Sequence, residues 1–242
     1  MDVKVLIEGA LESELDKLME EFSPLTKVSL GIRNAYVSKS GVAIVNTAVG
    51  VSNAAATTAL ACSILRPQCI ISQGTAGAHD QDLHTGDIVI GETILRLGTW
   101  MTPKRKSGVD PFQWDMLTLP PNQVYPDCIC HSDKALVALA LQEARHLGYT
   151  EQHEPKVRVG CIGSAEVYDR ENAMIEHLHK RFGTNCEEME SFAAAHIAEE
   201  FNVPFLGLRV ISNNELLDEE FYEPIGEKIQ ALSAAVARSL TC

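Results

Sequence analysis

Short apolar runs alternate along the chain with longer segments in which apolar residues recur every three or four positions. The runs of strand length lie at 3–7, 42–46, 69–72, 86–90, 157–162 and 205–211, and segments of helical spacing lie at 11–22, 54–65, 133–147, 170–181, 192–201 and 225–240. Repeated strand and helix units of this kind are typical of α/β proteins. We therefore predict one α/β domain over residues 1–242, with a central mixed and largely parallel sheet flanked by helices.

The pattern fails between residues 98 and 127, where five prolines exclude a regular element. This segment also holds Trp100, Phe112 and Trp114, so we expect a long structured loop that covers a functional site or packs against a second copy of the chain. Its basic run at 104–106 is more simply explained as a solvated turn than as a contact to an anionic substrate tail.

The overall charge narrows the class of partner. The 242 residues include 20 Lys and Arg against 33 Asp and Glu, which gives a formal net charge of -13. A nucleic-acid footprint or an anionic membrane patch is therefore not expected, and the partner should be a small molecule. The N-terminus resembles no signal peptide, no span has membrane length, and the seven cysteines are scattered, so we expect a cytoplasmic protein without a disulfide framework.

Polar residues follow several of the predicted strands, at the edge where open α/β sheets bind ligands. These residues form four groups: Glu12 with Glu14, residues 75–78, residues 188–190 and residues 212–214. Each group alone has a plain structural explanation, since acids favour the first turn of a helix and Thr, Ser and Asn are frequent in caps and turns. Their combination on one sheet edge favours a binding site.

Four segments resemble the nucleoside phosphorylase and nucleosidase superfamily, and the 5′-methylthioadenosine/S-adenosylhomocysteine nucleosidases in particular. They are GALESEL at 9–15, AVGVSNAAA at 48–56, GTAGAHDQDLHTGDIVI at 74–90 and EMESFAAAHIAEEFNVPFLGLRVISN at 188–213. The resemblance implies cleavage of the bond between C1′ of a ribose and a purine base, with water or phosphate as nucleophile. It also implies a homodimer, or a multiple of one, that needs no cofactor and no metal.

The resemblance further implies a role for individual residues. Glu14 matches the carboxylate that activates the attacking water, Glu190 the carboxylate that binds the ribose hydroxyls, and Glu188 an acid that helps to hold the water. Asn213 stands at the position that assists the leaving base. The remaining residues expected to bind substrate are Val49, Thr75, Ala76, Gly77, Val167, Tyr168, Met189 and Ser212.

Ser72 decides between the two nucleophiles. Phosphorylases of the superfamily carry an Arg at this position, and a phosphate dianion without that guanidinium loses its best bidentate partner. Hydrolysis is therefore favoured. Phosphorolysis remains an alternative if Arg33 or Arg96 recruits phosphate, and so does a nucleoside-binding protein without turnover, although such a protein would not need all three glutamates.

Asn213 is the main departure from the family pattern. The methylthioadenosine nucleosidases have an Asp here that protonates N7 of adenine, and an amide can only donate or accept a hydrogen bond. Asn213 suits a 6-oxopurine nucleoside such as inosine or futalosine. Alternatively, Glu215 or Asp218 in the following loop replaces the missing acid.

A zinc site is a further alternative that the spacing disfavours. Cys128, Cys130 and His131 stand close together, with His79 or His84 as additional ligands. The spacing is tighter than that of a zinc knuckle, and no second pair of cysteines stands at a fitting distance. We therefore predict no metal site.

Overall fold

Most of the apolar runs become strands of one ten-stranded sheet. The computed structural model describes residues 2–98, 128–150 and 155–241 together with four two-residue strands between 100 and 124. The sheet consists of β1 (Val5–Gly9), β2 (Leu25–Ser29), β3 (Asn34–Ser38), β4 (Val42–Asn46), β5 (Cys69–Ala78), β6 (Ile88–Arg96), β11 (Ile129–His131), β12 (Val157–Ser164), β13 (Thr184–Glu188) and β14 (Phe205–Asn213).

The sheet is mixed, as predicted, and part of it closes on itself. Strand β1 lies between β4 and β5 and is parallel to both. Strands β6, β12, β13, β5 and β14 pair in that order, and β14 also pairs with β6, so these five strands form a closed ring. Strands β3 and β2 extend the other edge in antiparallel fashion.

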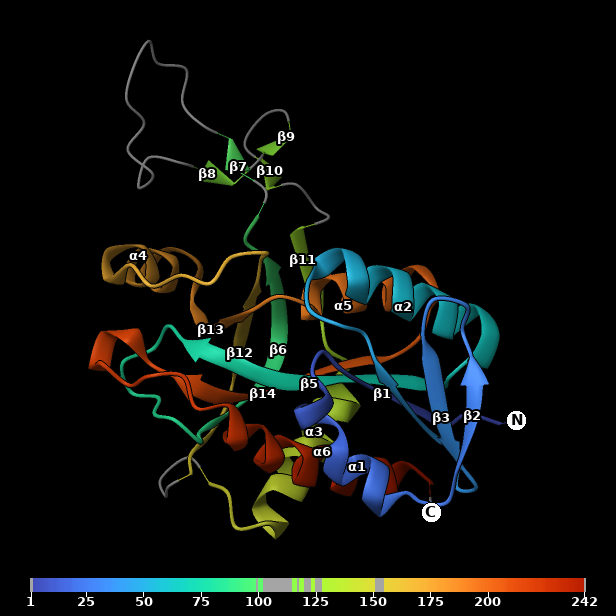
Figure 1. Cartoon of the computed structure of the whole chain (residues 1–242). Coiled ribbons are helices and arrows are strands. Elements are labelled where there is room, and N and C mark those ends of the chain that lie inside the picture. Colours follow the sequence, from blue (N-terminus) through green and yellow to red (C-terminus); the bar gives the residue numbers. More distant parts are fainter. Residues whose placement is uncertain are drawn as a thin grey trace.

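Helices cover both faces of the sheet (Figure 1). Helices α2 (Val51–Leu65) and α5 (Ser191–Glu200) lie together on one side, and α1 (Asp16–Glu21), α3 (Lys134–His146) and α6 (Gly226–Thr241) lie on the other. A large apolar core fills each of the two interfaces. A smaller cluster lies beside α4 (Asn172–Phe182). No helix among the described residues combines the length and apolar composition needed to cross a bilayer.

Short elements complete the described part of the chain. Three single-turn 3-10 helices are η1 (Glu12–Glu14), η4 (Glu215–Leu217) and η5 (Glu223–Ile225), and the short strands are β7 (Trp100–Met101), β8 (Asp115–Met116), β9 (Thr118–Leu119) and β10 (Gln123–Val124). Strand β7 pairs with β8, and β9 with β10. The predictions for the side chains of Trp100, Phe112 and Trp114 and for the run 104–106 lie outside the described residues.

Two parts of the sheet differ from the sequence prediction. The strand predicted at 69–72 does not end there in a turn, because β5 continues through 74–78 and pairs with β14 as far as Gly77. Its glycines allow side chains of other segments to approach the backbone closely. A Cβ atom on Gly74 would lie 2.8 Å from Oε1 of Glu14, and one on Gly77 would lie 3.3 Å from Nδ2 of Asn213. The hairpin of β2 and β3 was not predicted at all.

Candidate active site

A cavity of about 430 Å³ opens where β1, β5, β13 and β14 end. All twelve residues that the sequence proposed for the site line it, so the structure brings together segments that are as far apart in the chain as Glu14 and Asn213. Nine further residues line the same cavity: Ala10, Leu11, Ala78, His79, Asp169, Ile175, Glu187, Glu215 and Phe221. The individual roles of these residues remain proposals.

Glu14 is a buried carboxylate that four donors hold in one orientation. Its Oε2 accepts hydrogen bonds from the backbone N–H groups of Ala10 at 3.0 Å and Leu11 at 3.1 Å. Its Oε1 accepts from the backbone N–H of Thr75 at 2.8 Å and from the Thr75 hydroxyl at 3.1 Å. The side chain is only 4% exposed, so the carboxylate is fixed against the floor of the cavity.

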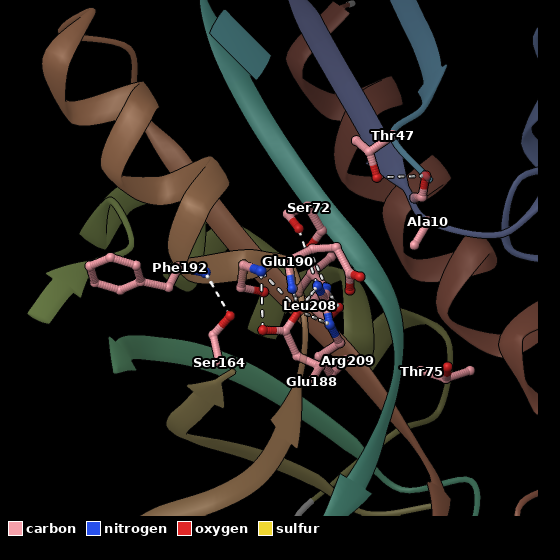
Figure 2. A network of polar contacts seen from close by, with 12 residues as sticks. Ala10, Thr47, Ser72, Thr75, Ser164, Glu188, Glu190, Phe192, Leu208 and Arg209 are labelled. Atoms are coloured by element: carbon pink, nitrogen blue, oxygen red, sulfur yellow. Dashed lines mark hydrogen bonds and ion pairs between the residues drawn. The ribbon is translucent and has the colours of Figure 1, made fainter. Parts of the chain in front are cut away.

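Glu188 forms a buried ion pair with Arg209 (Figure 2). Its Oε2 accepts from Nε of Arg209 at 3.2 Å and also from Nη2 of the same guanidinium. The same carboxylate caps α5, because it accepts from the backbone N–H of Glu190 at 3.0 Å and from that of Ser191 at 2.9 Å. Its Oε1 also accepts from the backbone N–H of Ser191, at 3.0 Å, so protein donors engage both oxygens of Glu188.

Arg209 was not singled out in the sequence, although a charged residue inside a strongly apolar strand is a visible signal. It is 1% exposed, and its Nη1 and Nη2 donate to the backbone oxygen and the hydroxyl of Ser72 at 2.9 and 3.2 Å. Ser72, at the position where phosphorylases carry an Arg, is thus turned toward this guanidinium. Neither residue lines the cavity.

The other two arginines considered for phosphate lie elsewhere. Arg33 donates to the backbone oxygen of Thr47 and to the side chain of Asn53, both at 3.3 Å. Arg96 lies over the ring of Phe192, 5.7 Å from its centroid. No arginine among the described residues lines the cavity.

Glu190, directly before α5, places a further carboxyl in the cavity wall. Its Oε1 accepts from the backbone N–H of Gly50 at 2.7 Å, and Gly50 has a φ of 103°, a conformation that favours glycine. Burial, followed by the neighbouring carboxylate of Glu188, raises the pKa of Glu190 to about 7. One oxygen is thus anchored, and the other has no hydrogen-bond donor among the described residues.

Asn213 ends β14, lines the same cavity and is 1% exposed. The Ser212 hydroxyl lies 2.9 Å from its Oδ1 and 3.1 Å from the backbone oxygen of Ala76. Its Nδ2 donates to Oε1 of Glu215 at 3.4 Å. Of the two acids considered as replacements for the missing Asp, Glu215 lines the cavity and Asp218 does not.

The histidines considered as zinc ligands have other partners. His79 lies 2.8 Å from the hydroxyl of Thr184, and His84 pairs with Glu219 at 2.6 Å. Among the described residues, the side chains that bring three ligand-type atoms within 4.8 Å of one another are Cys130, His196 and Glu199. None of these three lines the cavity.

The chain belongs to the phosphorylase superfamily, whose family model matches residues 4–241. It is similar to the 5′-methylthioadenosine/S-adenosylhomocysteine nucleosidase of Halalkalibacterium halodurans, with 26% identity over 216 residues that cover 87% of this chain and 85% of the relative. The nucleosidase of the same name from Tolumonas auensis is 27% identical over 247 residues, which cover 98% of this chain and all of the relative.

Two solved structures share the fold. The methylthioadenosine/adenosylhomocysteine nucleosidase of Neisseria meningitidis in complex with methylthio-immucillin-A has a TM-score of 0.78 at 24% identity and covers 98% of this chain and 99% of its own. The futalosine hydrolase of Helicobacter pylori has a TM-score of 0.80 at 20% identity and covers 99% of both chains. The predicted fold class and the predicted family resemblance are therefore confirmed.

Proposed function

We propose that this chain hydrolyses the bond between C1′ of the sugar and the base of a purine nucleoside. The observation that carries the proposal is the placement of Glu14, Glu190 and Asn213 around one cavity. Glycosidic cleavage passes through a sugar with oxocarbenium character, which requires a carboxylate near the water, a firm hold on the sugar hydroxyls and assistance to the departing base. The names of the curated relatives support the hydrolase class expected from the sequence.

Glu14 takes the proton of the attacking water. As the water oxygen bonds to C1′, the bond from C1′ to the base nitrogen breaks and its electron pair leaves with the base. Four hydrogen bonds hold the Glu14 carboxylate still, so no reorganisation is needed when the water approaches. Glu188 acts through position: its carboxylate holds the backbone at Glu190 and Ser191.

The sugar lies between Glu190 and the middle of β5. The oxygen of Glu190 that Gly50 leaves unbound accepts from the ribose hydroxyls, and Met189 lies beneath the ring. Val49, Val167 and Tyr168 are between 45% and 51% exposed and cover the mouth of the cavity. The residues that face the sugar and the base from the sheet are Thr75, Ala76, Gly77 and Ser212.

Turnover should need no phosphate. The guanidinium of Arg209 is buried and engaged by Glu188 and Ser72, and the described cavity lining holds no arginine, so a phosphate dianion finds no bidentate partner there. Incubation with a nucleoside in phosphate-free buffer should release free sugar rather than sugar 1-phosphate. Activity that appears only after phosphate is added would show that the chain is a phosphorylase.

The substrate is identified by a panel of four nucleosides. Methylthioadenosine, adenosylhomocysteine, inosine and futalosine differ in the base and in the 5′ substituent, and the released base can be identified for each. Release of a purine base from at least one of them supports the proposed function. If none of the four is cleaved, with or without phosphate, the proposal is wrong.

Asn213→Asp should raise activity on 6-amino nucleosides relative to 6-oxo nucleosides. Adenine leaves best when an acid protonates N7, whereas the Asn213 amide only donates a hydrogen bond to that atom. We expect the ratio of the two kcat/KM values to change by about 1 to 3 kcal/mol, the scale of one matched hydrogen bond to a buried group. A wild type that already prefers adenine, with no change on substitution, would identify Glu215 as the acid.

We also propose that the protein acts in the cytoplasm as a homodimer. Ile64 on α2 is 49% exposed although it is apolar, on a helix that packs beside α5. The family resemblance implies a homodimer or a multiple of one, and a second copy packed on α2 would cover this side chain. The six described cysteines form no disulfide, which fits a reducing compartment.

A further inference from the structure

Glu187 is a buried carboxyl in the cavity wall that the proposed mechanism does not use. It is the residue before the last in β13 and is 7% exposed. Its Oε1 accepts from the backbone N–H of Asp169 at 3.4 Å, while its Oε2 has no hydrogen-bond partner among the described residues. Nε2 of His79 is 3.8 Å away, beyond hydrogen-bond distance. A buried polar atom without a hydrogen-bond partner is costly, so we expect a bound ligand to supply the partner of this oxygen.

The carboxyl of Glu187 holds its proton near neutral pH. Burial, followed by the charge of Asp169, raises the pKa of Glu187 to about 8, and burial also raises the pKa of Asp169. Burial lowers the pKa of His79 to about 3, so this neighbour is neutral. A protonated carboxyl keeps its carbonyl oxygen as an acceptor, so Glu187 can present an acceptor to the cavity in either protonation state.

Glu187 and Asn213 line the same cavity from the two strands next to β5. Both are paired with Gly77, since β13 and β14 flank β5 on its two sides. Residues in register on neighbouring strands project to the same face of a sheet, and two strand spacings separate the outer pair by roughly 10 Å. Both side chains line the cavity of about 430 Å³, which has room for a flat purine ring, and the Asn213 amide lies over Gly77, where a Cβ atom would come within 3.3 Å of its Nδ2.

We infer that Glu187 determines base specificity by accepting a hydrogen bond from N1–H of a 6-oxopurine. This inference rests on the proposed function and names the class of base. A 6-oxopurine offers N7 and O6 as acceptors and N1–H as a donor. Asn213 donates an N–H to the edge that carries N7 and O6, and Oε2 of Glu187 accepts from N1–H. The last torsion of a glutamate turns at little cost, so either carboxyl oxygen can face the base.

Adenine fits this arrangement poorly. It has a donor at N6 and a bare acceptor at N1, which is the reverse of the 6-oxopurine pattern. Bound in the same place, adenine N1 would face the lone pairs of Glu187, and the exocyclic amine would face the N–H of Asn213. Two acceptors in contact and two donors in contact are both unfavourable, and specificity arises as much from such mismatches as from matched bonds.

The test compares 5′-methylthioinosine with 5′-methylthioadenosine, which share the sugar and the 5′ group and differ in the base. For Glu187→Gln we expect kcat/KM on the 6-oxo substrate, divided by that on the 6-amino substrate, to fall by about fivefold to a hundredfold, the scale of one matched hydrogen bond. The amide gains an N–H donor, which opposes N1–H of the 6-oxopurine and suits the bare N1 of adenine. An unchanged or increased ratio in the variant overturns the inference.

Glu8→Gln is the matched control. Glu8 is also a buried carboxyl with one unpartnered oxygen, and burial raises its pKa to about 8, but it does not line the cavity. Its substitution should leave the ratio unchanged. A wild type that releases no base from any nucleoside rejects the proposed function, whereas an active wild type with an unchanged ratio in Glu187→Gln rejects the inference alone.

A second measurement needs no variant and decides the matter if Glu187→Gln fails to fold. Methylation at N1 of inosine removes the donor while keeping N7 and O6. Wild-type kcat/KM on 1-methylinosine should be lower than that on inosine by about fivefold to a hundredfold. Equal values for the two nucleosides would overturn the inference.

Discussion

Glu14→Gln is expected to lower kcat by at least about a hundredfold, because removing a general base costs that much or more. Binding of the nucleoside should stay largely intact, since the sugar is held from Glu190 on the other side of the cavity. The substitution also places an NH₂ group against donors, because both oxygens of Glu14 accept backbone N–H groups. Single-turnover kinetics with a separate binding measurement distinguishes the loss of rate from a loss of affinity.

Two further variants serve as the control and the comparison for Glu14→Gln. Glu12→Gln removes an exposed acid from the same 3-10 helix, outside the cavity, and should leave kcat unchanged. Glu190→Gln should weaken binding of the sugar as well as the rate. Equal and small effects of Glu14→Gln and Glu190→Gln would mean that both carboxylates only terminate helices and that the reaction takes place elsewhere.

The sequence predicted the strands whose residues are buried on both faces. Strand β14 is buried along all nine residues and β1 along all five, and such strands read as continuous apolar runs. The hairpin of β2 and β3 escaped prediction because β2 is an edge strand with no buried residue, so its pattern carries little apolar signal.

The continuation of β5 could not be predicted because its glycines look like turn residues. Gly74 and Gly77 stand where side chains of other segments approach the backbone, Glu14 in the first case and Asn213 in the second. Those neighbours are 60 and 136 residues away in the chain. Local pattern therefore favoured a turn, whereas pairing with β14 keeps the segment extended.

The candidate site was predicted through resemblance, and this explains which cavity residues were missed. Glu187 stands directly before the quoted segment that starts at Glu188, so no motif drew attention to it. His79 and Asp169 join it only because β5, β13 and the segment after β12 meet at one point. Burial and the lack of a partner, which make Glu187 informative, are properties of the fold and leave no trace in local sequence.

Arg209→Met should destabilise the protein by about 3 to 5 kcal/mol, the usual cost of leaving one partner of a buried ion pair alone. Arg209 and Glu188 are 1% and 5% exposed, and the guanidinium also serves both oxygens of Ser72. Without it, the Glu188 carboxylate keeps only the backbone N–H groups at the start of α5. The free energy of unfolding from denaturant titration measures this loss.

Arg238→Met is the matched control, because Arg238 pairs with Glu21 at the surface, where the two side chains are 52% and 35% exposed. Exposed pairs contribute about 0 to 1 kcal/mol, so this variant should unfold almost as the wild type does. Adding Glu188→Gln to Arg209→Met removes the stranded charge and should recover part of the loss, since an amide oxygen still accepts from the backbone of α5. The contrary result is that Arg209→Met lowers the free energy of unfolding no more than Arg238→Met does. That result would show that the backbone N–H groups at the start of α5 are sufficient for the Glu188 carboxylate and that the ion pair with Arg209 does not stabilise the fold.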